Sequence, residues 1–161
     1  MVKADSNLLK VVKLSGTGTN KDSEVIEFEP RQGEGVVIKK VIWYGYASRP
    51  PSPAAGMSFG VAAVLTRDLD QEDASSGDDS NICEYHHLRI SNGTGDYLQG
   101  IAEIMREIDF GEDGILVPSK IKAIAGGSNV DSGASWLCVA YIVYDYVKLP
   151  KQEYLRYLMG E

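Results

Sequence analysis

The chain has 161 residues, a hydrophobic content of 43% and a net charge of −7. These values fit one globular domain with its own core and exclude a chain that is disordered throughout. The acidic balance disfavours the basic surface that a nucleic-acid backbone requires, so we expect no direct nucleic-acid site. The first residues lack the apolar length of a signal peptide or a transmembrane segment, and we expect neither.

Turn signals divide the chain into short segments, of which we expect about eight to be strands. The clearest strands span residues 8–14, 23–30, 36–47, 57–66, 82–91, 120–125 and 136–149. Residues 96–110 are ambiguous, because their apolar positions fit a helix as well as a strand, and we favour a helix at their start. A short helix is expected over residues 150–161, where Pro150 suits a first turn.

The pattern predicts an all-β fold, an antiparallel β-sandwich with a short C-terminal helix, because strands and helices do not alternate along the chain. We expect residues 1–161 to form a single domain, with a Pro-rich loop at 48–56 and an acidic loop at 68–81 inside it. The strand count fits a jelly roll and an immunoglobulin-like sandwich equally. Cys83 and Cys138 lie in apolar strands, so we expect buried free thiols.

The segment Glu84-Tyr85-His86-His87 is the first candidate for a metal site. On a strand, Glu84 and His86 share one face while His87 points to the other, which leaves two ligands at best. We therefore expect no metal and no cofactor, although a cupin-type enzyme would place its metal at His86. The chain also lacks the nucleophile and phosphate-loop motifs, so we predict no catalytic residues and no enzyme.

The acidic loop carries carboxylates at the first, third, fifth and twelfth positions of a calcium loop, namely Asp68, Asp70, Glu72 and Asp79. The sixth position of such a loop requires glycine, and Asp73 occupies it here. We therefore predict a solvated loop and leave divalent-ion binding open. Asn92-Gly93-Thr94 is both a formal glycosylation sequon and an Asn-Gly turn.

The last predicted strand is apolar on both faces until Asp145, whereas a sandwich core covers only one face of each sheet. Tyrosine, with nine copies in the chain, suits surfaces that become dry on association. We therefore predict a subunit interface, with core packing as the alternative role for the same residues. The predicted interface residues are Trp43, Tyr44, Tyr46, Tyr141, Tyr144, Tyr146, Tyr154, Leu155 and Leu158.

Three stretches follow one another along the chain: EFEPRQGEGVVIKKVIWYGYAS, FGEDGILVPSKIKAIAGG and SWLCVAYIVYDYVKLPKQEYL. In this order they resemble small single jelly-roll virion proteins, especially capsid proteins of archaeal and bacterial viruses. The resemblance is architectural and covers residues 25–155.

The resemblance implies a jelly roll that self-assembles as a structural subunit, with itself and other virion proteins as partners. It implies location in a virion assembled in the host cytoplasm, and it assigns no catalytic residues. The alternative function is a β-sandwich module that binds carbohydrate or another ligand through exposed Trp43, Tyr44 and Tyr46.

Overall fold

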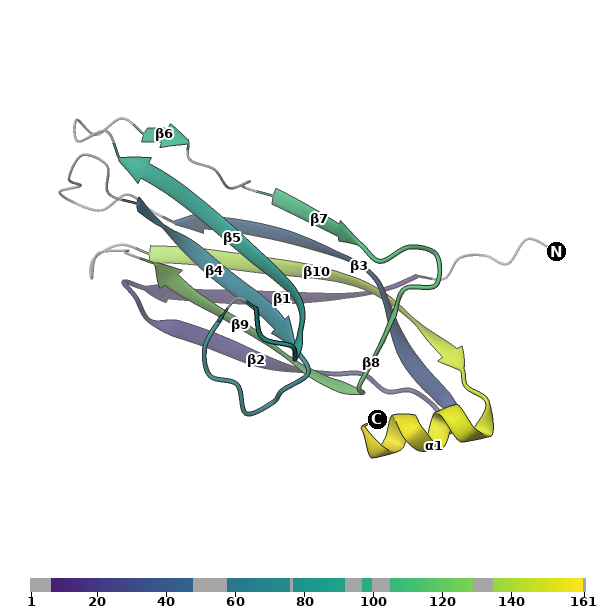
Figure 1. The fold of residues 1–161 in the computed structure, drawn as a ribbon. Helices are drawn as coiled ribbons and strands as arrows, with labels where there is room; N and C mark the ends of the chain where they lie inside the picture. The colour runs from purple at the N-terminus through teal and green to yellow at the C-terminus, as the bar shows by residue number, and fades with distance from the viewer. Residues whose placement is uncertain are drawn as a thin grey trace.

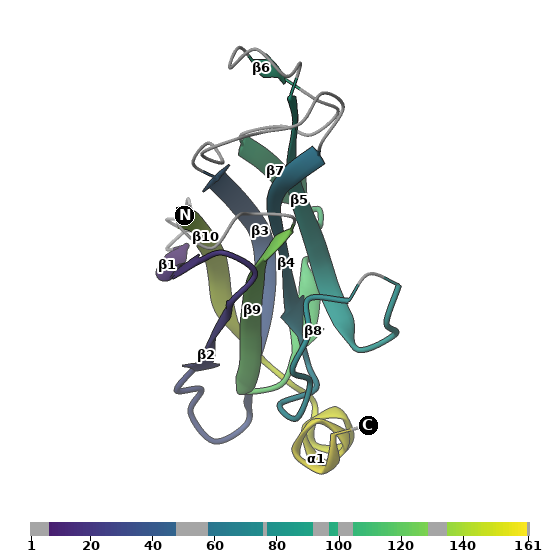
Figure 2. The ribbon, with the colours of Figure 1, turned by 90° about the vertical axis from the view of Figure 1, so that its left-hand side faces the viewer.

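Two antiparallel sheets stack face to face, and a short helix lies at one end of the stack (Figures 1 and 2). The computed structural model describes residues 7–47, 58–75, 77–91, 97–99, 105–128 and 135–160. The prediction of an all-β sandwich with a short C-terminal helix is confirmed. The Pro-rich loop at 48–56, Asn92 and the first six residues lie outside the described ranges.

Sheet A has the strand order β1-β10-β3-β7, and β8 also pairs with β3. Its strands are β1 (Leu8–Thr17), β10 (Ser135–Lys148), β3 (Glu34–Ala47), β7 (Met105–Asp109) and β8 (Ile115–Val117). Sheet B has the order β2-β9-β4-β5-β6. Its strands are β2 (Lys21–Glu27), β9 (Lys120–Ser128), β4 (Ser58–Thr66), β5 (Asn81–Ser91) and β6 (Tyr97–Gln99). Helix α1 (Lys151–Met159) closes the chain.

The strand order is that of a jelly roll. The first strand pairs with the last, the second with the next to last, and β3 with β7 and β8. The two halves of the chain therefore form one long antiparallel ribbon that is rolled into two sheets. This order separates the jelly roll from the immunoglobulin-like sandwich, which the sequence could not do.

The expectation of a helix at the start of residues 96–110 is wrong, because Tyr97–Gln99 is strand β6 and Met105–Asp109 is strand β7. In β7 the half-buried Ile108 packs against the core, while Met105, Glu107 and Asp109 are exposed. This alternation is the period of a strand. Pairing with β3 across the sheet outweighs the helical spacing of the apolar residues.

The two sheets meet through a stack of aromatic rings. Trp43 of β3 lies parallel to Tyr85 of β5, with 5.8 Å between ring centroids and 11° between planes. Gly45, on the same side of β3, makes room for this contact, because a Cβ atom there would lie 2.6 Å from Tyr85 Cε1. Trp43 and Tyr85 are both fully buried, so the stack fixes how one sheet sits on the other.

A β-bulge in β3 interrupts the regular alternation of this strand. Val143 of β10 is paired with Lys40 and Tyr144 with Ile38, so Lys39 is the extra residue. Val36 and Ile38 on one side of the bulge, and Val41 and Trp43 on the other, therefore all face the core. Strand β8 pairs with Val36–Ile38 of β3 and strand β7 pairs with Lys40–Tyr44, so the partner edge is split at the bulge.

The two cysteines are free and buried, as predicted. Cys83 of β5 is 8% exposed and Cys138 of β10 is 1% exposed, and both belong to the core cluster. Burial raises the pKa of each thiol to about 12. Both thiols therefore remain protonated in the folded protein at neutral pH.

The buried thiols predict a loss of stability at alkaline pH. An unfolded thiol has a pKa of about 8.5, so above that pH the unfolded chain releases protons that the folded protein retains. The stabilisation is complete below about pH 8.5 and is lost as the pH rises toward 12, by about 1.4 kcal/mol per pH unit for each thiol. Denaturant unfolding between pH 8 and 10 should show a shallower decline for Cys138→Ala than for the wild type. Parallel declines would contradict the raised pKa.

Candidate interface surfaces

A two-sheet sandwich has two outer faces, and the apolar side chains are buried on one of them and exposed on the other. On sheet B, Val64 of β4 and Ile124 of β9 point away from the core, because their neighbours Leu65 and Ala123 point into it. Val64 and Ile124 are nevertheless 1% and 0% exposed. Their burial requires a cover on the outer face of sheet B.

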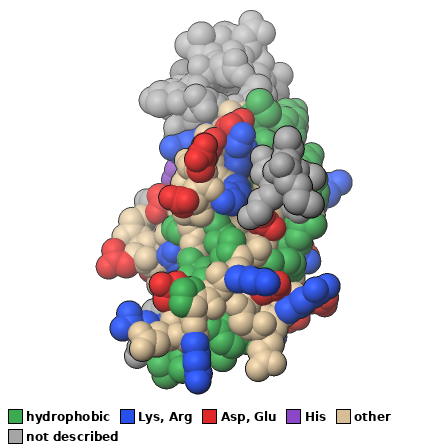
Figure 3. All heavy atoms as spheres, turned by 90° about the vertical axis from the view of Figure 1, so that its right-hand side faces the viewer, with side chains coloured by type: hydrophobic (Ala, Val, Ile, Leu, Met, Phe, Trp, Pro, Cys, Tyr) green, Lys and Arg blue, Asp and Glu red, His purple; other side chains and the backbone are tan. Residues whose placement is uncertain are grey.

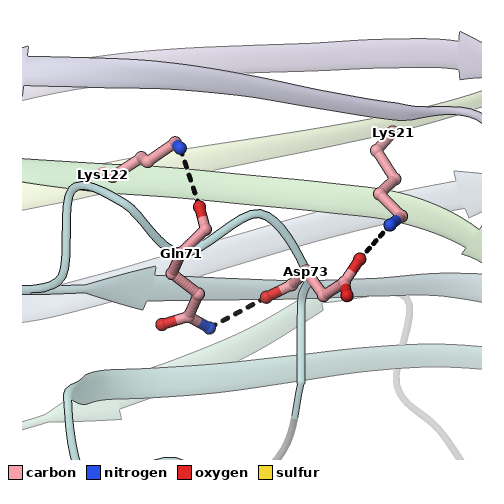
Figure 4. Close-up of polar contacts among 4 residues, drawn as sticks. All are labelled: Lys21, Gln71, Asp73 and Lys122. Carbon is pink, nitrogen blue, oxygen red and sulfur yellow. Dashed lines mark hydrogen bonds and ion pairs between the residues drawn. The ribbon is translucent and has the colours of Figure 1, made fainter.

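The cover is formed by the described residues between β4 and β5, 67–75 and 77–80, which we call the sheet B loop. Lys122, two residues before Ile124, donates hydrogen bonds from Nζ to the carbonyl oxygens of Leu69 at 3.1 Å and Gln71 at 2.7 Å. Lys21 of β2 pairs with Asp73 further along the loop, and Lys21 lies opposite Gly126 in the sheet (Figure 4). The loop is thus fixed on both sides of Ile124.

Most described residues of this acidic loop are exposed, as predicted, but the loop is also anchored to sheet B, which was not predicted. Its anchors are mainly backbone carbonyl groups, and Gln71 also donates to the carbonyl oxygen of Asp73 at 2.8 Å. The carboxylates of Asp68, Asp70, Glu72 and Asp79 remain on exposed residues. Across the described part of the chain, no group of three His, Cys, Asp or Glu side chains is placed to hold a metal ion.

Among the residues that the structure describes, no comparable loop is anchored over the tyrosines on the outer face of sheet A. In one row across the sheet, Tyr141 of β10 is paired with Val11 of β1 and Ile42 of β3. In the neighbouring rows Leu9 of β1 is paired with Val143 of β10, and Tyr44 of β3 is paired with Val139 of β10 and Met105 of β7. Six of the large side chains on this face are exposed: Leu9 58%, Val11 54%, Tyr44 38%, Tyr46 41%, Met105 62% and Tyr141 39%. This face is the second face of the long apolar strand β10.

The exposed apolar area of this face lies within the range of about 300–600 Å² that the largest patch on a typical monomer covers, and such patches are often functional. At about 200 Å² for a whole tyrosine and about 100 Å² for an aliphatic side chain, the six residues expose about 400 Å². The apolar share of a standard interface of about 800 Å² per partner is only slightly larger. The outer face of sheet A therefore has the size and composition of one side of a protein contact.

A hollow of about 830 Å³ opens on the same face, beside the β-bulge. Its floor includes Ile42 and Val143, and its rim includes Lys40, Asp109 and Glu112. Lys40 lies 2.8 Å from Glu107 and 3.9 Å from Asp109, which raises the pKa of the lysine, chiefly through its hydrogen bond to Glu107. The hollow thus has an apolar floor and a charged rim.

Two of the predicted interface residues are buried in the core, and a third is half-buried. Trp43 is 0% exposed and Tyr144 is 7% exposed. Tyr146 is half-buried against the core, and its hydroxyl accepts a hydrogen bond from the backbone N–H of Glu29 at 2.9 Å. The prediction is wrong for Trp43 and Tyr144, because the strand period turns them inward, away from Tyr44 and Tyr141. An aromatic ligand platform on β3 accordingly lacks its tryptophan.

Helix α1 presents a second exposed apolar surface. Leu155, Leu158 and Met159, which we call the helix ridge, are 50%, 61% and 66% exposed. No residue of α1, which the structure describes in full, is buried. Tyr157 lies on the opposite side, where it lines a small cavity of about 260 Å³ with Leu116 and Pro118. The helix therefore rests on the sandwich through Tyr157 and leaves the helix ridge outside.

The strand β5 separates the candidate metal ligands as predicted. His87 is 1% exposed, whereas His86 is exposed and Glu84 is half-buried. Glu84 Oε1 already accepts hydrogen bonds from the backbone N–H of Gly77 at 2.6 Å and from Asn81 Nδ2 at 2.9 Å.

Within the described ranges, no helix has the length and apolarity to cross a membrane.

Comparisons with known proteins give no family. No protein-family model and no curated protein sequence matches the chain. Among solved structures, the chain is similar to "Crystal structure of 60-mer BFDV Capsid Protein", with 12% sequence identity, a TM-score of 0.30, and coverage of 89% of this chain and 95% of that chain. A second similarity is to "Structure of infectious bursal disease virus Gx strain", with 10% identity, a TM-score of 0.22, and coverage of 89% and 37%. Both TM-scores are below 0.5.

The anchoring of the sheet B loop predicts different effects for two neighbouring lysines. Lys122→Ala removes two hydrogen bonds to backbone carbonyls and should lower the free energy of unfolding by about 1–2 kcal/mol. The matched control is Lys120→Ala on the same strand, whose ion pair with Glu27 is exposed and should contribute less than about 0.5 kcal/mol. Denaturant unfolding measures both, and equal losses would show that Lys122 does not anchor the loop.

Proposed function

We propose that this chain is a structural subunit of a virion or similar protein shell, and that it assembles with copies of itself. The observation that carries the proposal is the outer face of sheet A, where six large apolar side chains are exposed across four strands. Apolar patches of this size are often functional, and a contact with another protein is one of the uses they serve. The jelly roll is compatible with a shell subunit but does not by itself indicate one, because lectin domains and cupins share the fold.

The contrast between the two outer faces supports this assignment. Sheet B covers its outward Val64 and Ile124 with a loop of the same chain. Sheet A leaves Val11, Tyr44 and Tyr141 exposed. The resemblance of the sequence to small virion proteins agrees with a shell, and the virion is where such a subunit acts. The proposal includes no cofactor and no catalytic role.

A module that binds carbohydrate is the weaker alternative. Its platform would consist of Tyr44 and Tyr46, since Trp43 lies in the core. Ligand binding by a chain that remains monomeric would favour that function over assembly.

Assembly through sheet A is tested with Tyr44→Thr combined with Met105→Thr, two residues that are paired across β3 and β7. Threonine retains strand propensity and removes apolar area. We expect the double variant to raise the protein concentration at which particles form by about tenfold or more, because about 1.4 kcal/mol per contact corresponds to a factor of ten. Thermal unfolding should stay close to that of the wild type, since both side chains are exposed.

The matched control is Val25→Thr, which changes a 45% exposed valine on sheet B. Sedimentation velocity across a concentration series measures the mass of each protein. A wild-type mass that stays at 17.5 kDa at every concentration would contradict the proposed function. Equal effects of the control and the double variant would contradict the role of sheet A.

A further inference from the structure

We infer that the contact is head to tail: the helix ridge of one copy docks on the outer face of sheet A of the next copy, over the hollow. This inference rests on the proposed function and adds the partner element and the symmetry of the contact. It starts from the fact that one chain exposes two separate apolar surfaces, the helix ridge and the outer face of sheet A. A twofold contact of sheet A with itself would leave the helix ridge exposed, whereas a head-to-tail contact buries both.

The shapes of the two surfaces are complementary. The helix ridge projects from a helix on which no residue is buried, and the hollow of about 830 Å³ lies in an otherwise open sheet face. A nine-residue helix is about 13 Å long, and four strands span about 14 Å from first to last. One helix laid across sheet A therefore reaches from β1 to β7.

Charged side chains lie around both surfaces. At about 100° per residue, Lys151 lies on the side of the helix ridge and Glu153 on the opposite side of α1, while Arg156 lies between Met159 and Glu153. Basic and hydrophobic side chains gather at the end of the molecule where α1 lies (Figure 3). Around the hollow, β7 and the turn after it bring four carboxylates and β3 brings two lysines; two of the carboxylates and both lysines line the hollow itself. The carboxylates belong to Glu107, Asp109, Glu112 and Asp113, and the lysines are Lys39 and Lys40.

Helix α1 cannot cover the outer face of sheet A in its own chain without losing its contacts at the end of the sandwich. The backbone N–H of Leu149, just before α1, donates to the carbonyl oxygen of Gly33 at 2.9 Å. Tyr157 lies against β8 and the turn after it, beside Leu116 and Pro118. Figures 1 and 2 both place α1 beyond the end of the sandwich. The occupant of the hollow is therefore the helix of a second copy.

A head-to-tail contact makes a prediction that a twofold contact does not. The helix variant is Leu155→Ala with Leu158→Ala, which keeps helix propensity and an intact sheet A. The face variant is Leu9→Thr with Tyr141→Thr, which keeps strand propensity and an intact helix ridge. Each variant alone should remain a monomer at concentrations where the wild type assembles. An equimolar mixture should form a dimer of twice 17.5 kDa and grow no further, because only one intact helix meets one intact face.

Sedimentation velocity of the wild type, the two variants and their mixture separates the outcomes. A helix variant that assembles like the wild type would overturn the head-to-tail contact while leaving self-assembly in place. A mixture that remains monomeric while the wild type assembles would overturn it equally. A monomeric wild type would overturn the proposed function and this inference together. Thermal unfolding confirms that each variant is folded, and Leu9→Thr alone replaces the face variant if the double change lowers the midpoint.

Discussion

A two-sheet sandwich has one interior but four sheet faces, and the remaining features follow from how this chain covers the two outer ones. Strand β10 is apolar on both sides, so packing its inner residues, such as Trp136 and Ile142, leaves its outer residues without a core. Sheet B meets the same constraint with a loop, because Lys122 holds the sheet B loop across Ile124. Sheet A leaves Tyr141 and its neighbours on the surface. An exposed apolar patch on this scale is often functional, and we propose that this one serves association.

The interior fixes which residues of β3 and β10 face outward. The stacked rings of Trp43 and Tyr85 fix the two sheets against each other, and Gly45 lets them approach. The bulge at Lys39 keeps both halves of β3 facing the core and splits the neighbouring edge into β7 and β8. The same bulge places Lys40 beside the carboxylates at the hollow. The bulge in β3 thus determines both the packing of the core and the shape of the outer face of sheet A.

Much of the fold could be predicted from alternation and turn signals, including most strands and the burial of Cys83 and Cys138. The helix expected near residue 97 failed because long-range pairing with sheet B and sheet A decided the conformation. The anchoring of the sheet B loop was missed because its anchors include the carbonyl groups of Leu69 and Gln71, which composition does not reveal. Trp43 was grouped with Tyr44 and Tyr46 by proximity in sequence, although the strand period places it on the opposite face.

The central claim is that another copy of the chain covers the outer face of sheet A. Hydroxyl-radical footprinting measures it directly, by comparing side-chain oxidation in the dilute monomer with that in the assembled protein. The account predicts that oxidation of Tyr44, Met105 and Tyr141 falls several-fold on assembly, while Leu69 on the sheet B loop, 39% exposed, keeps its rate. Equal oxidation of Tyr141 in the monomer and in the assembled protein would contradict it.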